Sequence, residues 1–198
     1  MEKIDELLDD LHRLQAQVEE EVEGLLEQKR KQFHYTLHQG KVSFASEVRK
    51  LHKAQRINVL AYLMRARPAH LLTAPIIYSV ILPIALMDIM VSLYQSVCFR
   101  AYGIPLVRRS DYIIIDRHKL SYLNAIEKFN CVYCGYGNGV IEYAREITAR
   151  TEQYWCPIKH ARRSRSAHEL INNFVDYGDA ETYHRELEKI REGIRHIE

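Results

Sequence analysis

The feature that most constrains this chain is an apolar run of 29 residues, from Leu71 to Phe99, whose only charged side chain is Asp88. A core helix of a soluble protein rarely runs this long without a polar face, so the run predicts a membrane-embedded segment. The alternative is a buried helix in a soluble bundle. The mean hydropathy of the chain is −0.31, which confines any membrane attachment to this region.

Two ways of insertion are compatible with the run. A straight helix of this length would measure about 43 Å, against about 30 Å for the hydrocarbon layer. Pro83 lies near its middle, where it removes a backbone donor. The sequence therefore favours a re-entrant helical hairpin with arms 71–82 and 84–99, and a single tilted span is the alternative.

Positive charges flank the run on both sides. Arg65 and Arg67 precede it, and three arginines follow it, namely Arg100, Arg108 and Arg109. Positive flanks are kept on the cytoplasmic side, so both ends are expected there. The acidic start of the chain, without an apolar stretch directly after it, predicts no secretory signal peptide. We expect a protein of the bacterial inner membrane whose soluble parts face the cytoplasm.

The charge of the whole chain is close to neutral, +2, but it is segregated along the sequence. Residues 1–27 hold ten acids and two bases, whereas residues 28–67 hold ten bases and one acid, Glu47. Basic blocks beside an apolar run predict contact with anionic lipid headgroups. A nucleic-acid partner is not expected, because the basic blocks lack a groove-reading motif or a stacking platform.

The pattern outside the apolar run is helical, so the predicted fold class is all-α. Residues 2–31 repeat apolar side chains every seven positions, at Ile4, Leu11, Val18 and Leu25. This repeat indicates either a coiled coil, formed with a protein partner or by self-association, or a helix packed on the protein's own body. A short helical piece ending at Gly40 and a basic helix over 43–67 follow.

The remaining elements divide the chain into three predicted parts: a charged helical arm (1–67), the membrane-embedded segment (68–110) and a small helical domain (111–198). The last is expected to contain helices near 119–130, 140–154, 166–176 and 179–195. Between the first two lies Cys131-Val132-Tyr133-Cys134-Gly135-Tyr136-Gly137-Asn138-Gly139, whose glycines predict a loop with unusual backbone dihedral angles.

Cysteine and histidine spacing carries the strongest chemical signal. Cys131 and Cys134 form a Cys-x-x-Cys pair, and Cys156 and His160 follow downstream. Three thiolates and an imidazole form a closed tetrahedral set of the kind that holds structural zinc. If 140–154 is one helix, its ends lie about 21 Å apart, so closure requires a bend, a shorter helix or a returning glycine loop.

Other interpretations of these cysteines stay open. Cys131 and Cys134 alone would form a dithiol redox pair, and cysteines also pack as small hydrophobic side chains. The Cys-x-x-Cys-Gly-Tyr and Cys-Pro pieces resemble the two knuckles of rubredoxin. That resemblance implies iron as the alternative to zinc, with His160 in the place of a fourth cysteine.

Asp88 is a further candidate, because an ionisable group inside a membrane segment is costly and usually functional. Ser92, Gln95 and Ser96 lie on the same helical face. This polar stripe would face a partner helix, a headgroup or a ligand, or else Asp88 would be solvated at a shallow interface. With His118, Asp88 is also the candidate centre of a lipid-modifying enzyme, although no motif of a named enzyme class is present.

Two longer stretches, Tyr122–Cys131 and Glu152–Ala161, resemble a family of small bacterial membrane proteins for which no activity is assigned. The resemblance covers about residues 70–163 and implies a bacterial membrane location. The first functional hypothesis is a membrane-anchored protein with a structural Cys3His module and an interaction or scaffold role. The second is a membrane-bound thiol redox protein that uses Cys131 and Cys134.

Overall fold

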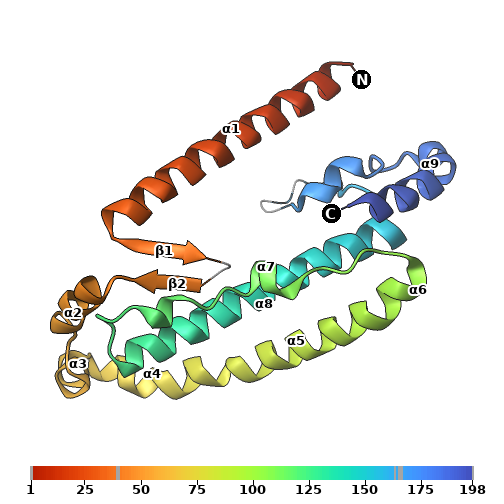
Figure 1. Ribbon diagram of the computed structural model, residues 1–198. Helices are drawn as coiled ribbons and strands as arrows, with labels where there is room; N and C mark the ends of the chain where they lie inside the picture. Colours follow the sequence, from red (N-terminus) through yellow and green to blue (C-terminus); the bar gives the residue numbers. More distant parts are fainter. Residues whose placement is uncertain (1, 39–40, 163, 165–166, 198) are drawn as a thin grey trace. The chain divides into compact units, whose positions relative to one another are not determined.

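The computed structural model describes residues 2–38, 41–162, 164 and 167–197. Within them the chain is mostly helical, with one two-stranded sheet, which confirms the all-α prediction (Figure 1). The chain divides into two compact units. The first comprises Met1–Asn58 with Lys119–Asn124, and the second comprises Val59–His118 with Ala125–Glu198.

The first unit begins with α1 (Glu2–Gln32), which coincides with the helix predicted over 2–31. The apolar side chains of its heptad repeat are exposed where the structure describes them. Leu11, Val18 and Leu25 are 45%, 58% and 57% exposed. The side chain of Ile4 lies outside the described ones.

A β-hairpin follows α1, where a short helical piece was predicted. Strand β1 (Tyr35–His38) pairs antiparallel with β2 (Lys41–Phe44), and Tyr35 lies opposite Phe44. Aromatic and β-branched residues favour strands here, and this preference overrides the predicted helix. Gly40 lies outside the described residues. The ring of Phe44 contacts His52 of α2 (Ser46–Ala54), and His52 contacts Tyr122.

The predicted basic helix over 43–67 is two helices in the structure. The first is α2, and the second is α3 (Val59–Arg65), which opens the other unit. Residues 55–58 between them are not helical. Asn58 immediately precedes α3, and asparagine favours the position before a helix because its side chain can accept from free backbone N–H groups.

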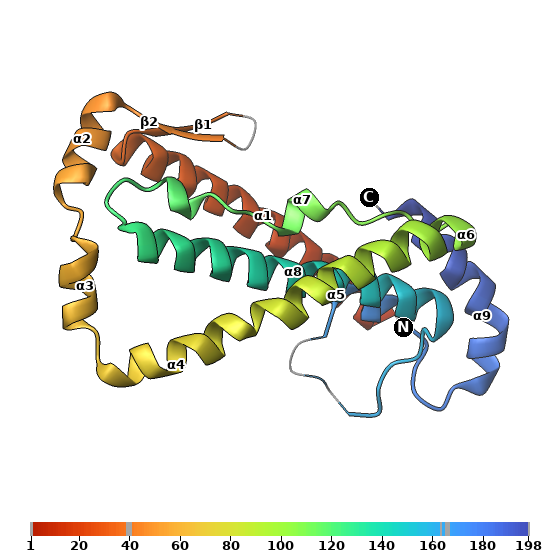
Figure 2. The ribbon, with the colours of Figure 1, turned by 90° about the horizontal axis from the view of Figure 1, so that it is seen from below.

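The apolar run forms one helical rod rather than a hairpin. Helices α4 (Pro68–Ser79), α5 (Ile81–Tyr94), η1 (Gln95–Phe99) and α6 (Arg100–Tyr102) succeed one another without a reversal (Figures 1 and 2). The re-entrant hairpin predicted at Pro83 is therefore wrong. Pro83 is the third residue of α5, and in the first turn of a helix the missing N–H removes no essential hydrogen bond.

The glycine stretch is also helical. A single helix of 31 residues, α8 (Ala125–Trp155), replaces the loop predicted between 130 and 140. The glycines here permit close packing. A Cβ at Gly139 would lie 2.7 Å from the Ile113 Cα and the Tyr112 carbonyl oxygen, and one at Gly135 would lie 3.1 Å from the Ile114 carbonyl oxygen. Small residues one turn apart let another backbone approach the helix.

Helix α8 runs parallel to the α4–α5 rod. The Tyr78 hydroxyl bonds to Asn130, and the Tyr94 hydroxyl bonds to Thr151. Residue numbers rise in the same direction along both helices, so the two run parallel. The connection after α6 returns as a mostly extended segment, 104–118, that carries α7 (Arg109–Tyr112) and enters η2 (Arg117–Lys119). This segment passes along the glycines of α8, as Figure 1 shows in green.

The buried core lies at the far end of this helical pair. Its centre is formed by six apolar side chains: Phe99, Ile104, Val107, Tyr143, Ile147 and Ile194. Beyond α8 come η3 (Glu169–Asn173), α9 (Ala180–Gly193) and η4 (Ile194–His196). Ile194 is fully buried, and Arg191 donates to the Tyr154 carbonyl oxygen over 2.9 Å. The C-terminal helices therefore close the core.

An aromatic cluster joins the ends of α6 and α8. Tyr102 stacks on Tyr154 with 5.3 Å between ring centroids, and Trp155 meets both rings edge-on, also at 5.3 Å. Contacts of this kind add to the burial of the rings. Trp155 is the only tryptophan of the chain.

Candidate functional site

The outer face of the α4–α5 rod is an exposed apolar stripe. The helical stretch Pro68–Tyr102 is 35 residues long and, by length and composition, apolar enough to cross a membrane. Its outward side chains recur about every turn and are mostly exposed: Leu72, Ile76, Leu82, Leu86, Ile89, Leu93 and Val97. Exposed apolar surfaces of this kind are typical of proteins that contact a membrane or another protein there.

The inner face of α5 carries the polar stripe that the sequence singled out. Asp88 is 7% exposed, and its carboxylate accepts two hydrogen bonds from the Arg109 guanidinium, one from Nε over 3.1 Å and one from Nη2 over 2.7 Å. The Tyr136 hydroxyl of α8 donates to the same carboxylate over 2.9 Å. Asp88 therefore faces side chains of the returning part of the chain and of helix α8, rather than solvent at a shallow interface.

Ser92 and Gln95 continue this network along α5. The Ser92 hydroxyl lies 3.4 Å from the Asp88 carboxylate and 3.3 Å from the Tyr143 hydroxyl. Gln95 makes a two-point contact with the backbone of Val107, donating to its carbonyl oxygen over 3.2 Å and accepting from its N–H over 2.9 Å. It also donates to the Tyr143 hydroxyl. Ser96, by contrast, donates to the Leu93 carbonyl oxygen of its own helix.

The electrostatics of the network follow from these contacts. The hydrogen bond to Asp88 raises the pKa of Arg109. Burial, followed by the hydrogen bond to Asp88, raises the pKa of Tyr136, so its hydroxyl stays protonated and donates. Arg109 balances the charge of Asp88, the one acid of the apolar helix, and Tyr136 adds a hydrogen bond to it. The network fixes three elements to one another: α5, α8 and the returning segment.

His118 does not join Asp88. It lies in η2, and no hydrogen bond or ion pair links the two side chains in the part of the chain that the structure describes. Its Nδ1 atom is buried without a hydrogen-bond partner there. The paired acid–base centre that would serve a lipid-modifying enzyme is thus not assembled.

The four predicted metal ligands are spread along and beyond α8. Cys131 and Cys134 lie in the second and third turns from its start, whereas Cys156 comes directly after its last residue, Trp155. At the rise of an α-helix, the 22 positions from Cys134 to Cys156 span about 33 Å. Within the described ranges, no group of three or more His, Cys, Asp or Glu side chains is arranged to hold a metal. All four cysteines carry free thiols.

The surroundings of the four side chains differ as well. Cys131 is partly buried, whereas Cys134 and Cys156 are exposed. His160 lies 3.9 Å from Glu152, whose other carboxylate oxygen is 2.9 Å from His168. The structure brings together Cys131 and Cys134 and leaves Cys156 and His160 apart from them. The Cys3His set stays a prediction that would require α8 to break.

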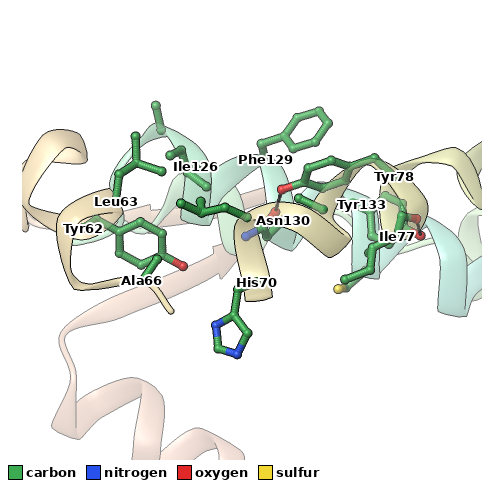
Figure 3. A pocket seen from close by; sticks show the side chains of 14 residues that line it. Tyr62, Leu63, Ala66, His70, Ile77, Tyr78, Ile126, Phe129, Asn130 and Tyr133 are labelled. Carbon is green, nitrogen blue, oxygen red and sulfur yellow. Dashed lines mark hydrogen bonds between the residues drawn. The ribbon is translucent and has the colours of Figure 1, made fainter. Parts of the chain in front are cut away.

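A cavity of about 720 Å³ lies between α3, α4 and the start of α8 (Figure 3). Its lining is mainly apolar, and its polar members include Tyr62, His70 and Asn130. The Tyr78 hydroxyl donates to the Asn130 side-chain oxygen over 2.7 Å, and the Tyr133 hydroxyl donates to the Ile77 carbonyl oxygen over 2.6 Å. These bonds bind α4 to α8 beside the cavity.

Sequence reasoning found Asp88, Ser92 and Gln95 but missed the residues that bind them. Arg109 was read only as a positive flank, and the tyrosines at 136 and 143 were not singled out. One signal was available. Tyr136 and Tyr143 are seven residues apart, which puts them on one face of any helix that continues through the glycines.

No protein-family model, no curated protein and no solved structure matches the chain significantly.

Proposed function

We propose that this protein is a membrane-surface anchor with an interaction role. Its α4–α5 rod lies lengthwise in one leaflet of an anionic membrane, and its apolar stripe contacts the acyl chains. Helix α1 recruits a protein partner or a second copy. The observation that carries the proposal is the two-sided character of α5: an exposed apolar outer face, and an inner face whose polar groups are satisfied by Arg109, Tyr136 and Tyr143.

The length of the rod favours a lengthwise position over an upright one. A helix of 35 residues measures about 52 Å, which exceeds the hydrocarbon layer of about 30 Å. An upright rod would also carry its neighbours into the bilayer. The returning segment holds Arg108, Arg109 and Asp111, and α8 holds Glu127 and Lys128 near its start and further charged side chains from Glu142 onward. Charges in hydrocarbon cost several kcal/mol each, roughly 2.5–3.5 at the centre on insertion scales.

Charge supports an anionic membrane as the partner. Arg65, Arg67 and Arg100 are exposed at the two ends of the rod. A basic residue near an anionic surface contributes about 1 kcal/mol to attraction. The location proposed here is the bacterial inner membrane, on its cytoplasmic side, as the sequence predicts.

The test is membrane association of the full chain and of two matched variants. Ile89→Glu places a carboxylate on the apolar stripe. Ile141→Glu makes the same change at an exposed position of α8, away from the stripe's own helix. We expect Ile89→Glu to weaken flotation with phosphatidylglycerol vesicles at least tenfold, since a charge in hydrocarbon costs more than about 1.4 kcal/mol. Ile141→Glu should float like the unmodified protein. Recovery of the unmodified protein in the soluble fraction after an alkaline carbonate wash would contradict the proposal.

Orientation is tested by labelling. Cysteines are introduced singly at Ala69 and Ala101, which are exposed at opposite ends of the rod, in a background without the native cysteines. A rod lying in one leaflet leaves both positions on the cytoplasmic side. An impermeant thiol reagent should therefore label both only after the cells are opened. Labelling of one position in intact cells would show that the rod spans.

The Cys131/Cys134 pair gives a second candidate function, a thiol redox role, because it is the one part of the predicted cysteine set that the structure keeps together. The pair lies within a helix, where side chains three residues apart have Cβ atoms about 5–6 Å apart. In a disulfide the two Cβ atoms lie about 3.5–4.5 Å apart, so oxidation of the pair would require local unwinding of α8. A Cys131–Cys134 disulfide formed reversibly under a glutathione redox buffer, detected by mass shift after alkylation, would favour this function.

A further inference from the structure

The cavity between α3, α4 and α8 differs from the apolar stripe in being hollow and partly enclosed. Its volume of about 720 Å³ falls within the range of about 300–1,000 Å³ that small-molecule sites occupy. The walls are formed by aliphatic and aromatic side chains such as Leu63, Ile77 and Phe129. An occupant of matching chemistry is therefore a long hydrocarbon group.

The cavity is continuous with the surface that faces the lipid in the proposed arrangement. Leu71, Ile77 and Phe129 both line it and are about half exposed. Leu72 and Ile76 on the same helix extend this apolar surface along the stripe. A chain of a membrane lipid could thus enter from the leaflet without crossing a polar layer.

Charge at one end specifies the kind of lipid. Arg65 ends α3 and Arg67 precedes α4, both are exposed, and Ala66 between them lines the cavity. No acidic residue occurs from Val48 to Met87. His70 also belongs to the lining, and in Figure 3 its ring extends away from the Tyr78–Asn130 pair. Arginine is the residue that recognises phosphate through paired hydrogen bonds.

We propose that this cavity holds one acyl chain of an anionic phospholipid, with the headgroup phosphate against Arg65 and Arg67. The inference rests on the proposed membrane location for the supply of lipid, and it adds a specific bound lipid to general anchoring. The occupied site would connect α3, α4 and α8 through a lipid, alongside the hydrogen bonds of Tyr78 and Tyr133.

The experiment counts phospholipids on the full chain, purified from membranes in mild detergent, by native mass spectrometry. Ala74→Phe fills the cavity from α4, and Ala69→Phe is its matched control, the same change on the same helix at an exposed position outside the lining. We expect one phospholipid on the unmodified protein and on Ala69→Phe, and at least fivefold lower occupancy on Ala74→Phe. Equal occupancy in all three would overturn the proposal.

Headgroup selection is measured by competition between phosphatidylglycerol and phosphatidylcholine on delipidated protein. The double variant Arg65→Gln/Arg67→Gln changes only exposed side chains, so its fold is kept even if Ala74→Phe fails to fold. The unmodified protein should prefer phosphatidylglycerol, and the double variant should lose at least fivefold of that preference. Failure of the unmodified protein to retain any lipid, or an unchanged preference in the double variant, would reject the site.

Vesicle flotation separates this inference from the proposed function. Ala74→Phe should still float with phosphatidylglycerol vesicles, because its apolar stripe is intact. If the unmodified protein floats but binds no lipid in detergent, the cavity proposal fails and anchoring survives. If it binds lipid but does not float, anchoring by the stripe fails.

Discussion

The Arg109 guanidinium holds the Asp88 carboxylate through two parallel hydrogen bonds, of 3.1 and 2.7 Å, although the residues are 21 positions apart and belong to different elements. Paired bonds of this geometry give orientation as well as attraction. The apolar helix is therefore attached to the returning segment at one defined register. The Tyr136 hydroxyl adds α8 to the same contact.

The first prediction concerns this contact. Asp88→Asn should lower the free energy of unfolding by about 1–3 kcal/mol, since it leaves the guanidinium with a weaker acceptor. Arg109 is about half exposed, so solvent screening keeps the coupling between Asp88→Asn and Arg109→Gln near 1 kcal/mol. Denaturant unfolding of the full chain in detergent measures this coupling energy, when the unmodified protein is compared with both single variants and the double variant. The exposed neighbour Arg108→Gln should change stability by less than about 0.5 kcal/mol. Additive effects of the two substitutions would contradict the prediction.

The second prediction concerns the close approach at Gly139. Gly139→Ala should destabilise the fold by about 1–3 kcal/mol, because its Cβ would meet the backbone of Tyr112 and Ile113 at 2.7 Å. Gly193→Ala is the control, since a Cβ there meets nothing within 4 Å. Gly193→Ala should raise the free energy of unfolding by up to about 1 kcal/mol, because alanine favours a helix more than glycine does. Thermal unfolding of both variants decides; a stabilising Gly139→Ala would show that the segment does not lie against α8.

The third prediction concerns α1, whose apolar seam is exposed. If α1 self-associates, the full chain in detergent should have a molar mass above that of the monomer by light scattering. Val18→Asp, on the seam, should return it to the monomer, since a charge at such a position opposes a coiled coil. Ala16→Asp, two residues earlier on the opposite face, should leave the assembly intact. A monomeric unmodified chain at tens of micromolar would leave only a different protein as the partner.

The fourth prediction concerns the cysteines and His160. Because about 33 Å separates Cys134 from Cys156 along α8, we expect the pairs Cys131/Cys134 and Cys156/His160 to act independently. Zinc and iron content of protein prepared without chelator is measured for Cys131→Ser, Cys134→Ser, Cys156→Ser and His160→Ala. If all four single variants remove one metal ion, a Cys3His site exists and α8 must break to form it.

Periodicity and composition were enough to predict some elements. The heptad repeat predicted α1 to within a residue, and the apolar run predicted the rod, because both are long patterns set by neighbouring residues. The polar stripe at Asp88, Ser92 and Gln95 followed from helical spacing alone. Its partner elements did not, since pairings across 48 or more positions leave no local trace in one sequence.

The errors have a common origin in reading glycine and proline as local signals. Gly135 and Gly139 do weaken a helix locally, but here they admit the backbone of the returning segment, and this packing outweighs propensity. Pro83 was read as a bend, although a proline in the first turn leaves a helix straight. Without the glycine loop, the predicted route by which Cys156 would reach Cys134 disappears as well.

The aromatic contact between Tyr102, Tyr154 and Trp155 supplies this chain with its own optical reporter. A lone indole set edge-on against two phenol rings at 5.3 Å receives their excitation energy and changes its emission when they move away. The rings come from the last residue of α6 and the last turn of α8. Separation of the two helix ends is thus visible as fluorescence of the unlabelled protein, in detergent or on vesicles, without any added dye.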